Sequence, residues 1–262
     1  MVAPTVAQAS SDFFRDRSDS NCIQDNGAFC VGWVLDNFDR YVDPLREHVV
    51  LVVVSVGLGF LIAFAMALAS HRRRWLVPPF IGATGVLYTI PSLAFFFLLL
   101  PITGRGSDTA IIALTAFNLQ IIYRNIVAGL AGVPGEAKDA GRGMGMSDQQ
   151  LLWRVELPLA VPEIIAGLRI ATVSTVAIAT LAVFAGGGGL GSELVAGSNI
   201  TFHTGVVTTS VLLIGMAIAF DVLLLLVQRR LTRWRSAGEV RKSRRPDLLR
   251  APRPAGPEDG GA

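Results

Sequence analysis

The sequence predicts an all-α polytopic membrane protein with five transmembrane helices. Apolar residues of the set AVILMFWYC make up 52% of the 262 residues, and the mean hydropathy is +0.52. Charged residues make up only 16%, whereas an average soluble domain carries about 25%. The apolar residues also gather in blocks that are long enough to cross a bilayer, for which a helix needs about 20 residues. This composition argues against a soluble globular enzyme.

The first 48 residues form a polar segment, with eight acidic residues against four arginines. We expect an extracytoplasmic tail here, with disorder over residues 1–20 and no cleavable signal peptide. Residues 29–35 lead into Phe38 and Tyr41, and are expected to lie as a short helix at the membrane interface. A sixth span in this region is the main alternative, but the segment is short and acidic at its end. Whether Cys22 and Cys30 form a disulfide on this oxidising side stays open.

Five apolar segments follow, within a transmembrane domain of residues 49–235. The first has 21 residues, a helix of about 31 Å, which matches one hydrocarbon thickness. The second contains three prolines, and the fourth begins beside Pro162, a residue suited to a first helical turn. Residues 236–262 are rich in Pro and Gly and are expected to be a disordered cytoplasmic tail. The five expected spans are Val49–Ala69, Leu76–Leu100, Thr109–Ala131, Val161–Ala185 and Thr204–Val227.

Clusters of arginine predict the orientation in the membrane. One cluster, His71–Arg74, follows the first span, and a second occupies residues 229–235 after the fifth. The loop between the third and fourth spans carries Lys138, Arg142 and Arg154. With five spans all three regions fall on one side, which the positive-inside rule assigns to the cytoplasm. The N-terminus is then outside and the C-terminus in the cytoplasm of a multi-pass protein of the cell membrane.

The long loop from Pro134 to Pro158 is the most informative stretch. It is expected to form two short helices around a turn at Gly143 and Gly145, with Ser147 and Gln150 spaced as a capping box for the second helix. Pro158 and Pro162 are expected to end that helix and restart the chain in the membrane. Loops of this length are usually functional, and small residues here would allow close approach of another backbone. A merely solvated amphipathic loop is the alternative.

Part of this loop resembles a motif of a known family. Asp139-Ala140-Gly141, then Gly145, then Val155-Glu156-Leu157-Pro158 resemble the EAA–G–I–LP loop of permease subunits of binding-protein-dependent ABC importers. In that family the loop forms a coupling helix that docks in a groove of the cytoplasmic ATPase. The resemblance spans roughly residues 45–235 and implies the type I ABC importer permease fold with a cytoplasmic helical coupling loop. The implied coupling residues are Glu136, Asp139, Ala140, Gly141, Arg142, Gly145, Leu157 and Pro158.

Four further motifs are similar to those of the osmoprotectant permeases: residues 88–93, 141–146, 155–162 and 186–191. This similarity implies import of glycine betaine, carnitine, choline or proline-type compounds. It also implies three partners: a cytoplasmic ATP-binding subunit, an extracytoplasmic substrate-binding protein, and a second permease copy or a paralogous permease. Whether the pore is a homodimer or a heterodimer stays open. Tyr88 and Pro91 are candidates for lining the pathway, and Gly187 and Gly188 for a flexible bend or gate at the outer mouth.

Several classes of function are not expected. The sequence has no phosphate-binding loop, so ATP is expected to bind the partner subunit, and this chain is expected to hold no cofactor of its own. No metal-binding or catalytic motif is present, so neither a metal site nor enzymatic activity is expected. Membrane lipid is an expected partner and nucleic acid is not. A permease for a different small polar solute and an integral membrane enzyme remain the alternatives.

Three charged residues lie deep inside the apolar spans: Arg124, Arg169 and Asp221. Each is about eight residues from the cytoplasmic end of its span, which places all three about 12 Å inside the same face. A lone charge at this depth is unfavourable by a few kcal/mol, which favours pairing within the bundle. We expect Asp221 to bond Arg169 or Arg124 and to hold the inner half of the bundle together. Snorkelling of each arginine to the interface is the alternative.

Overall fold

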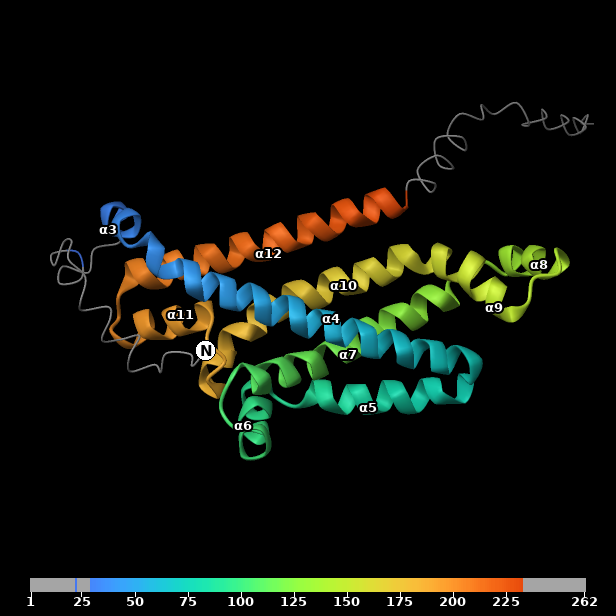
Figure 1. The fold of residues 1–262 in the computed structure, drawn as a ribbon, viewed down its shortest axis with the longest axis horizontal. Helices are drawn as coiled ribbons and strands as arrows, with labels where there is room; N and C mark the ends of the chain where they lie inside the picture. Colours follow the sequence, from blue (N-terminus) through green and yellow to red (C-terminus); the bar gives the residue numbers. More distant parts are fainter. Residues whose placement is uncertain (1–21, 23–28, 233–262) are drawn as a thin grey trace, which may run out of the picture.

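The computed structural model describes Cys22 and residues 29–232, all of whose regular structure is helical. The disorder expected for residues 1–20 and 236–262 therefore lies outside the described residues. Long helices run side by side along the longest axis of the molecule (Figure 1). In chain order the elements are α3 (Val31–Asp36), η1 (Phe38–Tyr41), α4 (Val42–Arg72), η2 (Arg74–Leu76), α5 (Val77–Thr89), α6 (Ser92–Thr103), α7 (Ser107–Ala131), α8 (Gly135–Gly143), α9 (Asp148–Leu151), η3 (Leu152–Glu156), α10 (Leu157–Ala179), η4 (Thr180–Ala185), α11 (Leu190–Asn199) and α12 (His203–Leu231).

Within the described residues, four helical stretches are long and apolar enough to cross a membrane, and a bent pair brings the number to as many as five. The pair is α5 and α6, which bend by 96° at Ile90 and Pro91. The expected second span over residues 76–100 is therefore not one straight helix but a pair of helices broken beside Pro91. Both residues at the bend are extended, with ψ of 127° at Ile90 and 129° at Pro91. At Ile90 the reason is that a proline disfavours a helical conformation of the residue before it. The four unbroken stretches are Phe38–Arg72, Ser107–Ala131, Asp148–Ala185 and His203–Leu231.

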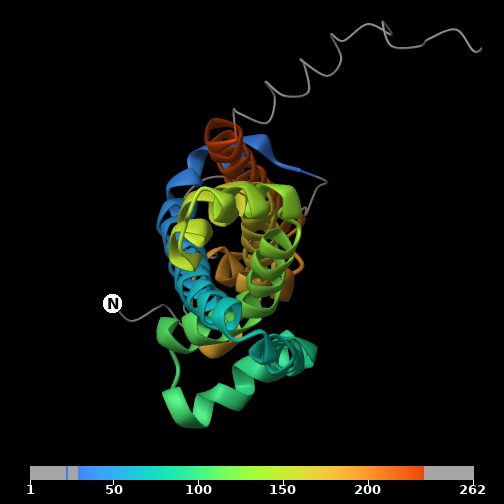
Figure 2. The same cartoon turned by 90° about the vertical axis from the view of Figure 1, so that its right-hand side faces the viewer.

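The two ends of the bundle differ in content. At one end, here named the loop end, lie α8, α9 and the junction of α4 with α5; at the opposite end, here named the α11 end, lie α3 and α11 (Figure 1). Seen along the bundle, α12 and the α5–α6 pair lie on opposite sides of α4, α7 and α10 (Figure 2). The three central helices therefore form the core against which the others pack.

Small residues allow α4 and α7 to pack closely. Gly59, Ala63 and Ala67 recur at four-residue intervals and share one buried face of α4. A Cβ on Gly59 would lie 2.9 Å from the Cβ of Asn118 on α7, which shows how near the two backbones come. Between apolar helices in lipid such close approach supplies dispersion energy, since lipid leaves little hydrophobic drive for helix association. The opposite face of α4 is exposed and apolar, as suits contact with lipid.

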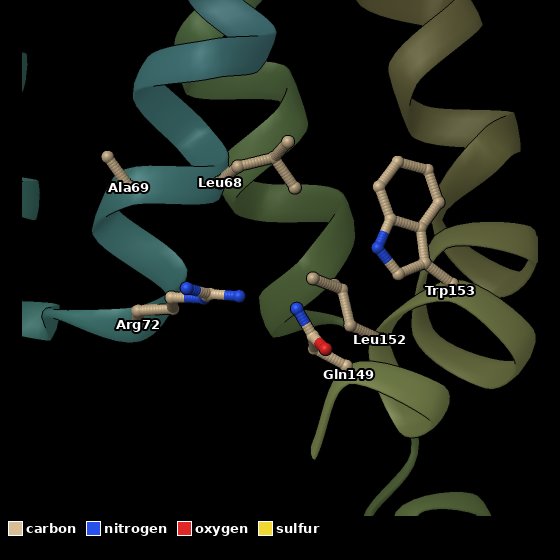
Figure 3. A pocket seen from close by; sticks show the side chains of 6 residues that line it. All are labelled: Leu68, Ala69, Arg72, Gln149, Leu152 and Trp153. Carbon is tan, nitrogen blue, oxygen red and sulfur yellow. The ribbon is translucent and has the colours of Figure 1, made fainter. Parts of the chain in front are cut away.

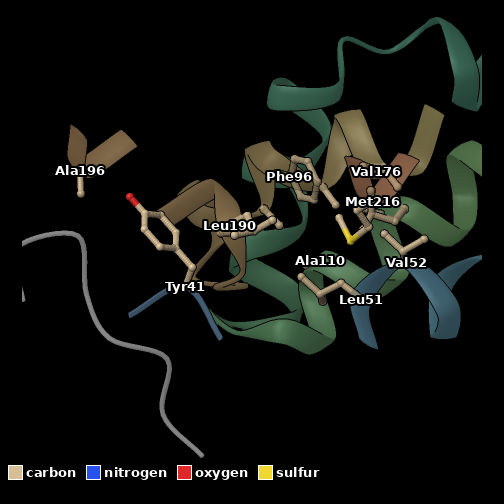
Figure 4. Packing of buried hydrophobic residues seen from close by; sticks show 14 of the residues in the cluster. Tyr41, Leu51, Val52, Phe96, Ala110, Val176, Leu190, Ala196 and Met216 are labelled. Atoms are coloured by element: carbon tan, nitrogen blue, oxygen red, sulfur yellow. The ribbon is translucent and has the colours of Figure 1, made fainter. Parts of the chain in front are cut away.

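The α11 end has its own apolar core, which joins the N-terminal segment to distant helices (Figure 4). Trp33 on α3 is 1% exposed and packs edge-on against Phe202, with ring centroids 4.8 Å apart. Tyr41 is equally buried, and α4 begins at Val42 rather than at Val49. The short helix expected near residues 29–35 is thus present, but its main aromatic side chains are buried in protein. Its other face, with Leu35 72% exposed, remains open.

Polar contacts fasten the same end. Arg40 Nε donates to Glu193 Oε2 over 2.6 Å, and the Gly189 backbone N–H donates to Glu47 Oε2 over 3.0 Å. Cys30 forms a disulfide with Cys22, and its backbone N–H donates to Thr204 Oγ1 over 3.1 Å. The stretch 186–203, expected as a loop, therefore holds a packed helix, α11, whose burial the charge and hydropathy pattern did not indicate.

Candidate functional site

The hairpin of α8 and α9 occupies the loop expected to be functional. The expected capping box is confirmed: Gln150 N donates to Ser147 Oγ, and Ser147 N donates to Gln150 Oε1. The chain reverses at Met144 and Gly145, and Gly145 has φ of +77°, a left-handed conformation that glycine adopts without steric conflict. Gly143 is instead the last residue of α8 and has no positive φ. Local sequence signals therefore account for the hairpin.

The coupling residues implied by the family motif fall into two groups. Glu136, Asp139, Ala140 and Arg142 are exposed, and Asp139 and Arg142 form an exposed pair with 3.7 Å between Oδ1 and Nη1. Gly141 is buried instead, and a Cβ there would lie 2.6 Å from Leu151 Cδ1. In this conformation its small size allows close packing within the hairpin. The exposed face of α8 is thus the part of the motif that is open to a partner.

The helix in the second half of the loop continues through Pro158 and Pro162. Asp148–Ala185 is one helical stretch in which η3, a π-helical turn over Leu152–Glu156, connects α9 to α10. The expectation that Pro158 and Pro162 end the helix is wrong. Pro158 lies in the first turn of α10, where a missing backbone N–H is tolerated, and the wider π turn shifts the hydrogen-bond register just before it. The hairpin is therefore continuous with a membrane span, and Leu157 is buried at that junction.

A buried carboxylate, Glu156, ties this junction to two other elements. Its side chain is 5% exposed; Oε2 lies 3.4 Å from His71 Nε2 on α4, and Oε1 lies 3.8 Å from Lys138 Nζ on α8. Lys138 Nζ also donates to the Leu130 carbonyl at the end of α7 over 3.4 Å. Oε2 accepts no hydrogen bond among the described residues, so its contact with His71 is an ion pair when the imidazole is protonated. One side chain thus connects α4, α8 and α10.

Two of the three intramembrane charges meet. Arg169 Nε and Nη2 donate to the two carboxylate oxygens of Asp221, each over 2.8 Å, in a bidentate pair between α10 and α12. Gln228 Nε2 on α12 donates to the Pro162 carbonyl on α10 over 3.0 Å, a second polar contact between the same helices. Arg124 on α7 is exposed and belongs to no ion pair in the part of the chain that the structure describes. The expected pairing of Asp221 is therefore with Arg169.

The residues proposed for the pathway lie in two different environments. Tyr88 is 46% exposed near the end of α5 and packs edge-on against Phe117, and Pro91 is exposed at the 96° bend. Gly187 and Gly188 are buried. A Cβ on Gly187 would lie 2.8 Å from the Cβ of Ala110 and 2.9 Å from the Cβ of Ala182. The glycine run is a closely packed turn in this conformation, so a flexible bend or gate at the outer mouth stays a prediction.

The comparisons identify the family. The family model "Binding-protein-dependent transport system inner membrane component" matches residues 55–234, which is more than half of the chain. The protein belongs to this permease family. It is therefore a multi-pass membrane protein and a transport subunit, and subunits of this family act with an ATPase and a substrate-binding protein.

Curated relatives and solved structures agree with this assignment. A choline transport system permease of Bacillus subtilis is 35% identical over 71% of this chain and 86% of its own. An osmoprotectant import permease of Salmonella typhimurium is 33% identical over 74% and 93%, and a carnitine transport permease of Listeria monocytogenes is 32% identical over 77% and 91%. A chain of the MetNI methionine ABC transporter in an inward-facing conformation matches with a TM-score of 0.65 and 21% identity, over 73% of this chain and 96% of that one. A chain of an amino acid ABC transporter matches with a TM-score of 0.66 and 18% identity, over 78% and 100%. The fold is that of type I ABC importer permeases.

Some contacts in the permease structure have no clear sequence signal. Glu156 belongs to the family motif quoted above, but nothing in the sequence indicates that its carboxylate meets His71 and Lys138. His48, at the start of an apolar run, is fully buried, with Nε2 3.1 Å from the Val176 carbonyl. Within the described residues no group of three His, Cys, Asp or Glu is placed to hold a metal ion.

Proposed function

We propose that this permease carries compact quaternary-amine or zwitterionic osmoprotectants, such as choline, carnitine and glycine betaine. The observation that carries this proposal is the similarity to curated permeases whose names give choline, carnitine and osmoprotectants as cargo, over about three quarters of the chain. Tyr88, 46% exposed and backed by the buried Phe117, offers an aromatic face beside the α5–α6 bend, and an aromatic face attracts a quaternary ammonium group. Tyr88 and Pro91 are proposed to line the pathway.

The ATPase subunit is proposed to dock on the exposed face of α8, which presents Glu136, Asp139, Ala140 and Arg142. Movement of α8 is passed to the spans through Glu156, since this carboxylate contacts both Lys138 on α8 and His71 at the end of α4. The continuous helix from α9 into α10 supplies a second rigid connection, through Leu157 and Pro158. The hairpin and the ends of two spans then move as one body when the ATPase closes.

The loop end is proposed to face the cytoplasm, with the substrate-binding protein approaching the α11 end. His71–Arg74, the hairpin, and Arg229 and Arg230 at the end of α12 supply the basic residues that favour this orientation. The window of α12 that fits a membrane span is 0% buried within this chain, so α12 has a long apolar face available to lipid or to a second permease.

An uptake assay tests the substrate. The permease is produced with its ATPase and binding protein in cells lacking other osmolyte importers, and labelled choline, glycine betaine, carnitine and proline are supplied. We expect uptake of at least one quaternary amine or betaine that requires ATPase activity. Strong uptake of a sugar or a metal ion, with none of these compounds, would contradict the proposal.

Glu156→Gln tests the coupling route. The amide keeps the size of the side chain but loses the charge that faces Lys138, so uptake should fall while ATPase docking and hydrolysis persist. Glu163→Gln, an exposed position on α10, is the matched control and should transport normally. Unchanged uptake in Glu156→Gln would exclude this side chain from the route.

Labelling from outside tests the orientation. In a chain whose two cysteines are replaced by serine, Asp36→Cys at the α11 end should react with a membrane-impermeant maleimide on whole cells. Met144→Cys, 70% exposed at the tip of the hairpin, should react only after the cells are opened. The opposite pattern would reverse the proposed orientation.

A further inference from the structure

We propose that a groove between α4 and the α9–η3 segment binds an anionic phospholipid of the leaflet at the loop end. The groove encloses about 330 Å³ and is lined by six residues, shown in Figure 3. Leu68, Ala69 and Arg72 come from the last turns of α4, and Gln149, Leu152 and Trp153 come from the loop. The site is independent of the docking face on α8 and of the transported solute.

The groove has a polar end and an apolar end, as a phospholipid has. In Figure 3 the Arg72 guanidinium points toward the Gln149 amide at one end of the groove, while Leu68 and the Trp153 ring lie toward the other end. The polar end is at the terminus of α4, and the apolar end lies about one turn further into the span. A phosphate placed between Arg72 and Gln149 would therefore leave its acyl chains beside apolar side chains.

The apolar end of the groove continues along a span. The Trp153 ring packs edge-on against Phe64, with centroids 6.3 Å apart, and Phe64 stacks on Phe60 at 5.6 Å. Trp153 is itself 55% exposed. Tryptophan is favoured at the boundary between headgroups and hydrocarbon, where its ring is apolar and its N–H is wet. The groove thus opens at the depth where a lipid headgroup meets its acyl chains, and an acyl chain can follow the exposed face of α4.

The charge of the groove selects the headgroup. No carboxylate lies within 4.0 Å of the Arg72 guanidinium, so its positive charge has no ion-pair partner among the residues that the structure describes. Arg73 and Arg74 follow directly and are also exposed. Basic residues at a membrane boundary attract anionic lipids, and an arginine next to an apolar wall favours a phosphodiester with its own net charge over a zwitterionic headgroup.

The test uses the complete transporter complex in nanodiscs that contain phosphatidylglycerol and phosphatidylcholine. A photoactivatable phosphatidylglycerol is crosslinked, and the labelled peptides are mapped. We expect labelling at residues 68–72 and 149–153, reduced about fivefold by Arg72→Gln, the effect of losing one basic residue near an anionic surface. Arg73→Gln and Arg74→Gln make the same change of charge next to the groove and should reduce labelling far less. Trp153→Ala should reduce it without any change of charge.

Four results would overturn the proposal. Equal labelling by a phosphatidylcholine probe would mean that the groove does not select charge. Equal losses in Arg72→Gln and Arg73→Gln would indicate attraction to the whole basic segment rather than a site. Competition by inorganic phosphate alone would show an anion site that needs no lipid. Loss of labelling only when the ATPase subunit is bound would show that the groove is part of the protein interface. Comparable thermal unfolding of each variant and the parent complex is the folding control.

Discussion

The loop end and the α11 end of the permease are held together by contacts of different range. At the loop end the Ser147–Gln150 cap joins residues three apart, and Gly141 packs against Leu151 within the same hairpin. At the α11 end Arg40 reaches Glu193 across 153 residues, and Cys30 reaches Thr204 across 174. The hairpin is thus specified mostly by its own sequence. The α11 end forms only when segments that are distant in sequence have packed together.

This difference predicts different outcomes of mutation. Contacts between distant segments at the α11 end are buried, so their loss should lower the stability of the whole fold. Contacts within the exposed hairpin should matter less for the fold and more for transport. The following changes test that contrast, from the largest expected effect to the smallest.

Glu193→Gln should be the most destabilising change. It removes the carboxylate that accepts from Arg40, where both side chains are largely buried, at 8% and 13% exposure. Breaking a buried ion pair from one side costs about 3–5 kcal/mol. Thermal unfolding in detergent measures the loss. Asp139→Asn, half of an exposed pair, is the control and should change stability by less than about 1 kcal/mol. Equal losses of stability in Glu193→Gln and Asp139→Asn would contradict the proposed difference between the two ends.

Gly191→Ala should cause the next largest loss of stability. A Cβ at this position of α11 would overlap the carbonyl group of Thr180, so the backbone must shift. Overpacking of this kind costs about 1–3 kcal/mol. Gly215→Ala on α12, where no atom lies within 4 Å of the added carbon, makes the same change of residue without a clash. If the thermal unfolding midpoint of Gly191→Ala is as high as that of Gly215→Ala, the backbone at the α11 end can shift to accommodate the added carbon.

Asp221→Asn tests the contact between α10 and α12, which lies between the loop end and the α11 end. The bidentate bond to Arg169 is lost and a cation is left inside a membrane span, so the yield of folded protein and the uptake should both fall. The reversed pair, Arg169→Asp with Asp221→Arg, should recover part of both. No recovery in the reversed pair would mean that the two charges have separate partners.

Gly145→Val should impair transport more than folding. At φ of +77° a side chain costs about 1–2 kcal/mol, and the strain falls on the turn that orients α8. Uptake should drop while the unfolding midpoint stays near that of the parent. Gly143→Val is the control, since this residue has no positive φ and nothing lies within 4 Å of its added carbon. A similar loss of uptake in both variants would assign the effect to bulk and not to the turn.

Ser147→Ala should have the smallest effect. It removes the side-chain acceptor of the Gln150 N–H, a contribution of about 1 kcal/mol to the first turn of α9. Hydrogen exchange at residues 148–151 should accelerate, with the global midpoint unchanged. A fall in the global midpoint would show that the hairpin takes part in the cooperative fold.

Much of the architecture could be predicted from local patterns. The expected Thr109–Ala131 and Thr204–Val227 spans agree closely with α7 and α12, because a predominantly apolar run of more than 20 residues indicates a span without knowledge of its neighbours. The capping box and the turn at Gly145 were also predictable, since each depends on residues a few positions apart. The sharp 96° bend in the second apolar segment was not, because the consequence of Pro91 for helix direction depends on what packs on either side of the bend.

The sequence by itself determined the membrane class, the position of most apolar helices and the position of the coupling motif, because these depend on composition and short spacing. Only the tertiary structure decided that Gly141 packs inward, that Asp221 pairs with Arg169 rather than Arg124, and that Glu156 meets His71 and Lys138. The identity of a charged or small residue does not indicate whether its side chain faces lipid, a partner or another helix. Its surroundings are set by how helices distant in sequence rotate and approach one another, and that is settled only when their buried faces pack together.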